Sequence, residues 1–134
     1  MTLVALERPH DVAPERLRRR AEFLAVASGQ RAHTSLLTLQ ARKDADRPDA
    51  KPRIGLTVTK KCGGAVERNR MRRRLRQAVR HVASSAAHTG HDYVIVARSG
   101  VLDAAFDHLI ADLEAAFRRV HTAKPGNPKT KRTD

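Results

Sequence analysis

Aromatic side chains and cysteine are scarce in this chain. Its 134 residues include no Trp, one Tyr, three Phe and one Cys. A hydrophobic core must therefore be built mostly from Leu, Val, Ile and Ala, and the length suits one ordinary domain. Because a single cysteine cannot form an intramolecular disulfide, the fold does not need an oxidising compartment.

Long apolar runs are also missing. None approaches the roughly 20 residues that are needed to span a bilayer. The first residues, MTLVALERPHD, contain only a short apolar stretch with no basic region before it, unlike a secretory signal peptide. These features predict a cytoplasmic protein with no membrane partner.

Acidic residues are few relative to basic ones. There are 14 Asp and Glu against 27 Lys and Arg, which gives a net charge of +13 and an isoelectric point near 11.3. Such a cationic excess repels itself unless a polyanion is present. The charge therefore favours a nucleic-acid partner over an anionic membrane surface.

Periodicity and chain-breaking residues predict an α/β fold, an α+β sandwich around one small central sheet. The predicted helices cover residues 14–28, 65–87 and 102–121, and the predicted strands cover 35–41, 53–59 and 92–98. The last strand is almost entirely apolar in its middle, which is typical of a strand covered on both sides. We assign 1–13 to an irregular segment, 14–122 to a single RNA-binding domain, and 123–134 to a basic disordered tail.

The segment 53–80 concentrates the positive charge, because it holds ten Lys or Arg residues and one acid, Glu67. A helical projection at about 100° per residue separates its helix into two sides. The apolar side consists of Met71, Leu75, Ala78, Val79 and Val82. The opposite side consists of Asn69, Arg72, Arg73, Arg76 and Arg80, with Arg70 at its edge. Arg68 projects near the apolar side, so we expect its guanidinium to bend back toward the preceding loop.

That loop, residues 60–64, joins a strand to the N-terminus of the helix. Its glycines, Gly63 and Gly64, predict backbone N–H groups that can approach a phosphate, which the helix dipole also favours. Lys60 and Lys61 add two full charges. Loop and helix together predict a surface that follows RNA phosphates.

A purely solvated arginine face is the alternative for this helix. Solvated faces usually interleave Glu with Arg, because opposite charges four residues apart attract each other. Here positions 68, 72, 76 and 80 are all Arg. The resulting repulsion is tolerable mainly when a polyanion lies opposite, which favours RNA binding.

The same segment resembles a known family. The run Lys60-Lys61-x-Gly63-x-Ala65-Val66-x-Arg68-Asn69-Arg70-x-Arg72-Arg73-x-x-Arg76 resembles the central motif of the bacterial ribonuclease P protein family. Residues 16–29 resemble the first helix of that family, and residues 92–98 resemble its later strand. The resemblance covers residues 14–120.

The resemblance implies a small central sheet with three helices, a left-handed βαβ crossover through the second helix, and similarity to the second domain of ribosomal protein S5. It implies the protein subunit of a ribonucleoprotein endonuclease that hydrolyses precursor tRNA to remove the 5′ leader. In that family the RNA subunit carries out the Mg²⁺-dependent cleavage, so the protein contributes no catalytic residue and no metal ligand. The implied partners are ribonuclease P RNA and precursor tRNA, with no stable protein partner.

The resemblance also assigns site residues. Those that contact the RNA subunit are Lys60, Lys61, Arg68, Asn69, Arg70, Arg72, Arg73 and Arg76. A cleft between the first helix and the sheet holds the single-stranded leader, and Phe23 and Arg19 are assigned to it. The Phe23 ring is available there for stacking on a base. A plain core position is the alternative for Phe23, which lies on the apolar side of an amphipathic helix.

Two positions depart from the family pattern. Many members carry a second aromatic residue one turn after the first, and another in the first strand. This chain has Ala27 and Gln40 at those places. We therefore expect leader binding to depend more on shape and charge than on stacking.

Other candidate sites have weaker support. Asp44, Asp46 and Asp49 lie in a charged loop without a partner motif, and a solvated loop is the simpler interpretation. His88 and His91 have no further His or Cys at the spacing of a metal site. Cys62 lacks the positioned base that a catalytic thiol requires, which leaves it a small residue in a tight loop.

Two other functions remain open. A structural, rRNA-binding protein of the ribosomal type would have the same composition, and co-purifying RNA would distinguish it. A cationic protein of the membrane surface is the third possibility, but the second helix has no Trp or Phe on its apolar face.

Overall fold

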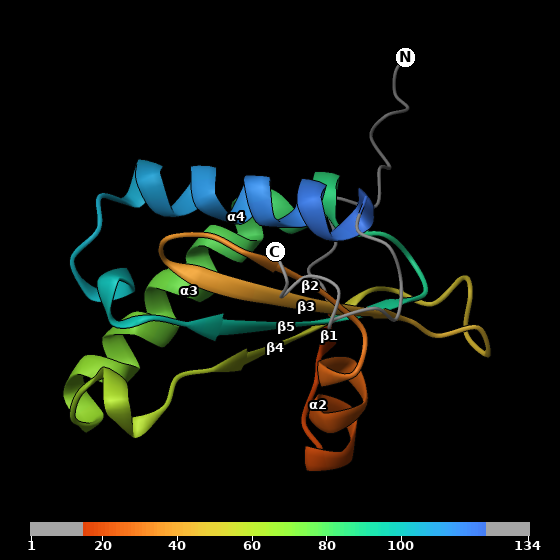
Figure 1. Ribbon diagram of the computed structural model, residues 1–134, viewed down its shortest axis with the longest axis horizontal. Helices are drawn as coiled ribbons and strands as arrows, with labels where there is room; N and C mark the ends of the chain where they lie inside the picture. Colours follow the sequence, from red (N-terminus) through yellow and green to blue (C-terminus); the bar gives the residue numbers. More distant parts are fainter. Residues whose placement is uncertain (1–14, 123–134) are drawn as a thin grey trace, which may run out of the picture.

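The computed structural model describes residues 15–122, which form one mixed sheet with helices on both faces (Figure 1). The helices are α2 (Arg20–Ala27), α3 (Ala65–Ala86) and α4 (Phe106–Thr122). The strands are β1 (Glu15–Arg16), β2 (Gln30–His33), β3 (Leu37–Lys43), β4 (Arg53–Thr57) and β5 (His91–Ala97). Two 3₁₀ turns, Lys60–Cys62 and Ser99–Leu102, precede α3 and α4. The predicted irregular segment 1–13 and basic tail 123–134 lie outside the described residues.

The strands follow the order β1-β4-β5-β3-β2 across the sheet. β4 runs parallel to both β1 and β5, whereas β3 is antiparallel to β5 and to β2. The α+β fold with a central sheet and three helices is thus confirmed. Helix α3 connects the adjacent parallel strands β4 and β5 as the predicted crossover, and the left-handed sense of that crossover stays a prediction.

The two faces of the sheet are covered unequally. Helices α3 and α4 pack on one face over the main core, and α2 lies on the other face (Figure 1). Along β5, Tyr93 and Ile95 enter the main core, while Val94 packs with Leu17 and Val26 in the smaller cluster under α2. The prediction that this strand is covered on both sides is confirmed. No helix within residues 15–122 combines the length and the apolar character needed to cross a membrane.

Helix α3 has the two sides that its sequence predicts. Its bounds differ from the expected 65–87 by one residue. Met71, Leu75, Ala78, Val79 and Val82 are all buried in the main core. The apolar side therefore fixes the helix on the sheet and turns its arginine side away from the core.

The first predicted helix is too long at its start. The helix begins at Arg20, and Glu15–Arg16 form strand β1 instead. The side chain of Glu22 explains the boundary, because its Oε1 accepts hydrogen bonds from the N–H groups of Arg18 and Arg19, both at 3.0 Å. Residues before this cap are free to pair with β4, where the N–H of Glu15 donates to Pro52 O at 3.1 Å.

The bounds of the strands and of the last helix also differ from the prediction. Strand β2 is absent from the prediction, and β3 runs from 37 to 43 rather than from 35 to 41. Strand β4 ends at 57 rather than 59, and β5 covers 91–97 rather than 92–98. Helix α4 starts at 106 rather than 102. The guanidinium of Arg74 donates hydrogen bonds to the carbonyls of Val101 and Ala104, which holds the 3₁₀ turn and the connection before α4.

Candidate nucleic-acid interface

The N-terminus of α3 is closed by its own residues. Glu67 Oε1 accepts a hydrogen bond from Gly64 N–H at 2.7 Å, and Arg68 Nε donates to Gly63 O at 3.2 Å. Gly63 has a φ of 140°, a backbone conformation that favours glycine. The prediction that Arg68 bends back toward the loop is confirmed.

The prediction that the backbone N–H groups of Gly63 and Gly64 bind a phosphate is wrong. Gly63 N–H donates to Lys60 O at 3.2 Å, and Gly64 N–H is taken by Glu67. Both donors are therefore satisfied inside the protein and are not offered to an anion. The loop contributes charge instead, because the side chains of Lys60 and Lys61 are exposed.

The basic face of α3 is the outer side of the helix, and it consists of Asn69, Arg72, Arg73, Arg76 and Arg80. Asn69 Oδ1 accepts a hydrogen bond from Arg72 Nη1 at 3.1 Å, which orders one guanidinium. Among residues 15–122, none of these four arginines forms an ion pair with Asp or Glu. Their charge is thus available to an external polyanion.

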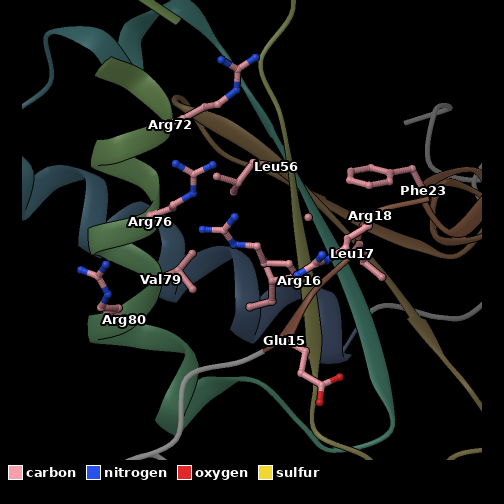
Figure 2. Close-up of a pocket in the computed structure, with 12 residues that line it drawn as sticks. Glu15, Arg16, Leu17, Arg18, Phe23, Leu56, Arg72, Arg76, Val79 and Arg80 are labelled. Atoms are coloured by element: carbon pink, nitrogen blue, oxygen red, sulfur yellow. The ribbon is translucent and has the colours of Figure 1, made fainter. Parts of the chain in front are cut away.

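A cleft of about 610 Å³ opens between this face and the β1 edge of the sheet (Figure 2). Its apolar part is lined by Leu17, Phe23, Ile54, Gly55, Leu56 and Val79. Its charged part is lined by Glu15, Arg16, Arg18, Arg72, Arg76 and Arg80. Five guanidinium groups and a single carboxylate therefore surround an apolar floor.

The extended segment that begins with β1 brings two arginines, Arg16 and Arg18, to this cleft. Its pairing with β4 continues at Leu17, whose N–H donates to Ile54 O at 3.3 Å and whose side chain is buried. Because side chains alternate along an extended chain, Arg16 and Arg18 on either side of Leu17 stay exposed. Partial burial lowers the pKa of Arg76, and the positive charges of Arg16 and Arg72 lower it further.

The ring of Phe23 lies against the sheet at Gly55, where a side chain would collide with it. Its helix is fixed by Arg53, which donates to Glu22 Oε2 at 3.0 Å and to both oxygens of the buried Asp92 at 2.8 and 2.7 Å. Phe23 packs on the small core cluster and also lines the cleft. Phe23 therefore has both of the roles considered for it, since one side of the half-buried ring packs on the core and the ring also lines the cleft.

The predicted site residues fall into separate places. Arg72 and Arg76 line the cleft, and Arg70, Arg73 and Arg76 line a second hollow on the outer side of α3. Arg19 is exposed but does not line the cleft, whereas its neighbours Arg16 and Arg18 do. The alternation of exposed arginines around the buried Leu17 could have indicated an extended segment, with Arg16 and Arg18 on one side. It was missed because residues from 14 onward were predicted to be helical.

The two positions that depart from the family pattern lie outside the lining of the cleft. Gln40 is half-buried in β3, between Val94 and Arg31 on the neighbouring strands. Ala27 ends α2, and its carbonyl accepts a hydrogen bond from Arg31 Nη2 at 3.0 Å. Neither residue lines the cleft, so Phe23 is the one aromatic residue among those that do.

The other candidate residues gather into no metal site. Residues 15–122 contain no group of three or more His, Cys, Asp or Glu side chains placed to hold a metal ion. Asp44 accepts a hydrogen bond from Asp46 N–H at 3.0 Å, as in a local turn. Cys62 is half-buried, with its thiol 3.7 Å from Ala97 O.

A helix with an acid-free basic face, beside a cleft with an apolar floor, defines an α+β domain of the RNA-binding class. The family model described as ribonuclease P matches residues 13–121. The chain therefore belongs to the ribonuclease P protein family.

Two similar relatives are each described as a ribonuclease P protein component. The one from Caulobacter vibrioides is 43% identical over 111 residues, covering 83% of this chain and 74% of the relative. The one from Bartonella quintana is 43% identical over 122 residues, covering 88% and 85%.

Solved structures agree on the fold. The RNase P protein from Staphylococcus aureus has a TM-score of 0.66 at 23% identity, with 78% of this chain and 93% of that chain covered. The RNase P protein from Thermotoga maritima has a TM-score of 0.64 at 23% identity, with 82% and 98% covered.

Proposed function

We propose that this chain is the protein subunit of ribonuclease P. It binds the RNA subunit at the N-terminal end of α3, through Lys60, Lys61, Arg68, Asn69, Arg70 and Arg73, and it binds the 5′ leader of precursor tRNA in the cleft, which Arg72 and Arg76 line. Family membership supports the first part. The observation that carries the second part is the composition of the cleft, in which arginines surround an apolar floor.

This composition suits single-stranded RNA. Unpaired bases expose apolar surfaces that can lie on Leu56 and Val79 and stack on the Phe23 ring. The phosphates of the same strand can bind Arg72 and Arg76 on the adjoining wall. A duplex buries its bases, so the apolar floor would have no partner in it.

The RNA subunit carries out the hydrolysis in this proposal and holds the Mg²⁺ ions that the reaction uses. A nuclease site on the protein would need clustered carboxylates or a His pair. The lining of the cleft includes one carboxylate, Glu15, and no His. The protein instead reduces the repulsion between the RNA strands and holds the leader, in the cytoplasm where precursor tRNA is processed.

Reconstitution tests this proposal. A bacterial ribonuclease P RNA cleaves a precursor tRNA at low Mg²⁺ concentration, with and without this chain. We expect the chain to restore cleavage at the mature 5′ end and to be inert without the RNA. If the chain binds RNA but never stimulates cleavage, a structural, ribosomal-type role replaces the proposal.

A further inference from the structure

A second hollow adjoins the cleft on the outer side of α3. It measures about 560 Å³ and is lined by Arg16, Arg70, Arg73, Arg74, Arg76, Gln77 and Arg80. It shares Arg16, Arg76 and Arg80 with the cleft. We call it the outer hollow, and no carboxylate is among its lining residues.

The three shared arginines come from two different elements. Arg16 extends from β1 toward α3, where its guanidinium lies beside Arg76 (Figure 2). Arg80 follows Arg76 by one turn of α3 and points outward from the helix (Figure 2). Within residues 15–122, none of the three donates a hydrogen bond to a carboxylate. Arg74 differs, because its guanidinium is held by the carbonyls of Val101 and Ala104.

Guanidinium groups that converge without an acid repel each other. Arg76 is half-buried, and the nearby positive charges of Arg16 and Arg72 disfavour its charged form. A phosphate between them would remove the repulsion, and the planar guanidinium can bind two phosphate oxygens at once. The arrangement therefore fits a phosphodiester better than an isolated protein surface.

We propose that Arg16, Arg76 and Arg80 form a phosphate clamp where the leader passes from the cleft to the outer hollow. This inference rests on the proposed function and adds Arg16 and Arg80 to the residues that bind the leader. A strand with its bases on the apolar floor places its backbone at the rim of the cleft. The three arginines stand at that rim, because they line both spaces.

The leader fits this clamp better than the RNA subunit does. The clamp borders the apolar floor at Val79 and Leu17, which only unpaired bases can use. Of the predicted contacts to the RNA subunit, Lys60, Lys61 and Arg68 lie at the N-terminal end of α3. Arg76 belongs to the same predicted set, and the clamp reassigns it to the leader because it lines both spaces. Arg80 is three turns further along that helix from Arg68.

The test uses the reconstituted holoenzyme and two precursor tRNAs, one with a leader of a single nucleotide and one with a leader long enough to cross the cleft. The variants are Arg16→Gln and Arg80→Gln. The matched control is Arg118→Gln, which removes the same charge from an exposed position of α4 outside both spaces. Thermal unfolding of each variant checks the fold, and Arg80→Gln tests the clamp even if the Arg16 change disturbs β1.

We expect each clamp variant to weaken binding of the long-leader substrate by about five- to tenfold. Binding of the short-leader substrate and of the RNA subunit stays within twofold of wild type, and Arg118→Gln changes neither. A series of long leaders, each with one phosphodiester replaced by a neutral methylphosphonate, locates the contact. Wild type loses affinity at one linkage, and Arg16→Gln is insensitive at that same linkage.

Three results overturn the clamp. Equal losses for both leaders together with weaker binding of the RNA subunit assign these arginines to the RNA subunit. Unchanged binding of the long leader by both variants removes any role in leader binding. Failure of the wild-type chain to stimulate cleavage of either substrate overturns the proposed function itself, and the clamp falls with it.

Discussion

The Phe23 ring in α2 lies directly on the backbone of Gly55 in β4. A Cβ atom at position 55 would stand 2.5 Å from Cζ and 2.6 Å from Cε2 of Phe23. A real side chain cannot come that close, so glycine at this position lets the aromatic ring reach the sheet. The same contact fixes the ring at the floor of the cleft.

Replacing this glycine should displace the ring. In Gly55→Ala, the new methyl group must push Phe23 away from β4, and overpacking of this kind costs about 1–3 kcal/mol. We expect lower thermal stability together with weaker binding of a long-leader precursor by the holoenzyme. Binding of the RNA subunit should stay unchanged. A variant that keeps wild-type stability would show that the ring does not occupy this place.

The packing of α3 predicts a purely structural variant. Leu75 is completely buried in the main core. Leu75→Ala should lower the free energy of unfolding by about 2–5 kcal/mol, because it leaves a cavity as well as removing apolar contact. Urea denaturation measures the loss. The neighbouring, exposed Arg73→Ala is the control, and comparable losses in the two variants would contradict the assignment of the two sides of α3.

The arginines on the basic face of α3, which form no ion pair with Asp or Glu within residues 15–122, predict a strong dependence of RNA binding on salt. Each phosphate contact contributes a slope of about 0.7–0.9 log units of affinity per log unit of salt. We expect Arg73→Ala to lower this slope by about that amount while thermal unfolding is unchanged. Titration of the RNA subunit at several potassium chloride concentrations measures it. An unaltered slope would place Arg73 outside the RNA contact.

A cluster of rings at the far end of the sheet predicts loss of stability in acid. The rings of His88 and His121 stack with their centroids 3.6 Å apart, and Tyr93 Oη lies 2.7 Å from His121 Nε2. Burial, together with the charges of His88 and His91, lowers the pKa of His121 from 6.5 to about 4. Burial also lowers the pKa of His88.

The sign of the effect follows from proton uptake. Between pH 6.5 and 4 the unfolded chain binds a proton at His121 that the folded protein does not bind. The stability contribution is therefore complete above pH 6.5 and declines as the pH falls toward 4. Thermal unfolding across this range should show a falling midpoint in wild type and a flatter profile in His121→Gln. Parallel profiles would remove His121 as the cause.

Helix α3 could be predicted closely because its information is local. Its apolar side repeats with the helical period, and the single acid Glu67 stands where a helix start needs one. The bend of Arg68 followed from the same projection. The prediction of a phosphate site at the two glycines was wrong because the sequence does not show that Lys60 O and the Glu67 carboxylate accept their N–H groups.

The edges of the sheet could not be predicted in the same way. Strand β1 has two residues and exists because it pairs with β4, almost forty positions later in the sequence. Strand β2 has only Ala32 buried, so its pattern carries little apolar signal. Arg16 reaches the cleft because of that distant pairing. For this reason the site residues predicted from the sequence do not include Arg16.

The central claim is that the N-terminal end of α3 binds the RNA subunit while the cleft binds the leader. One pair of variants, Arg73→Ala and Phe23→Ala, tests this claim. Two dissociation constants are measured for each variant. The first is for the protein and the RNA subunit, and the second is for the saturated holoenzyme and a long-leader precursor tRNA. The account predicts that Arg73→Ala weakens only the first and Phe23→Ala only the second. If both variants weaken binding in the same one of these two equilibria, the N-terminal end of α3 and the cleft are not separate sites, and this account is contradicted.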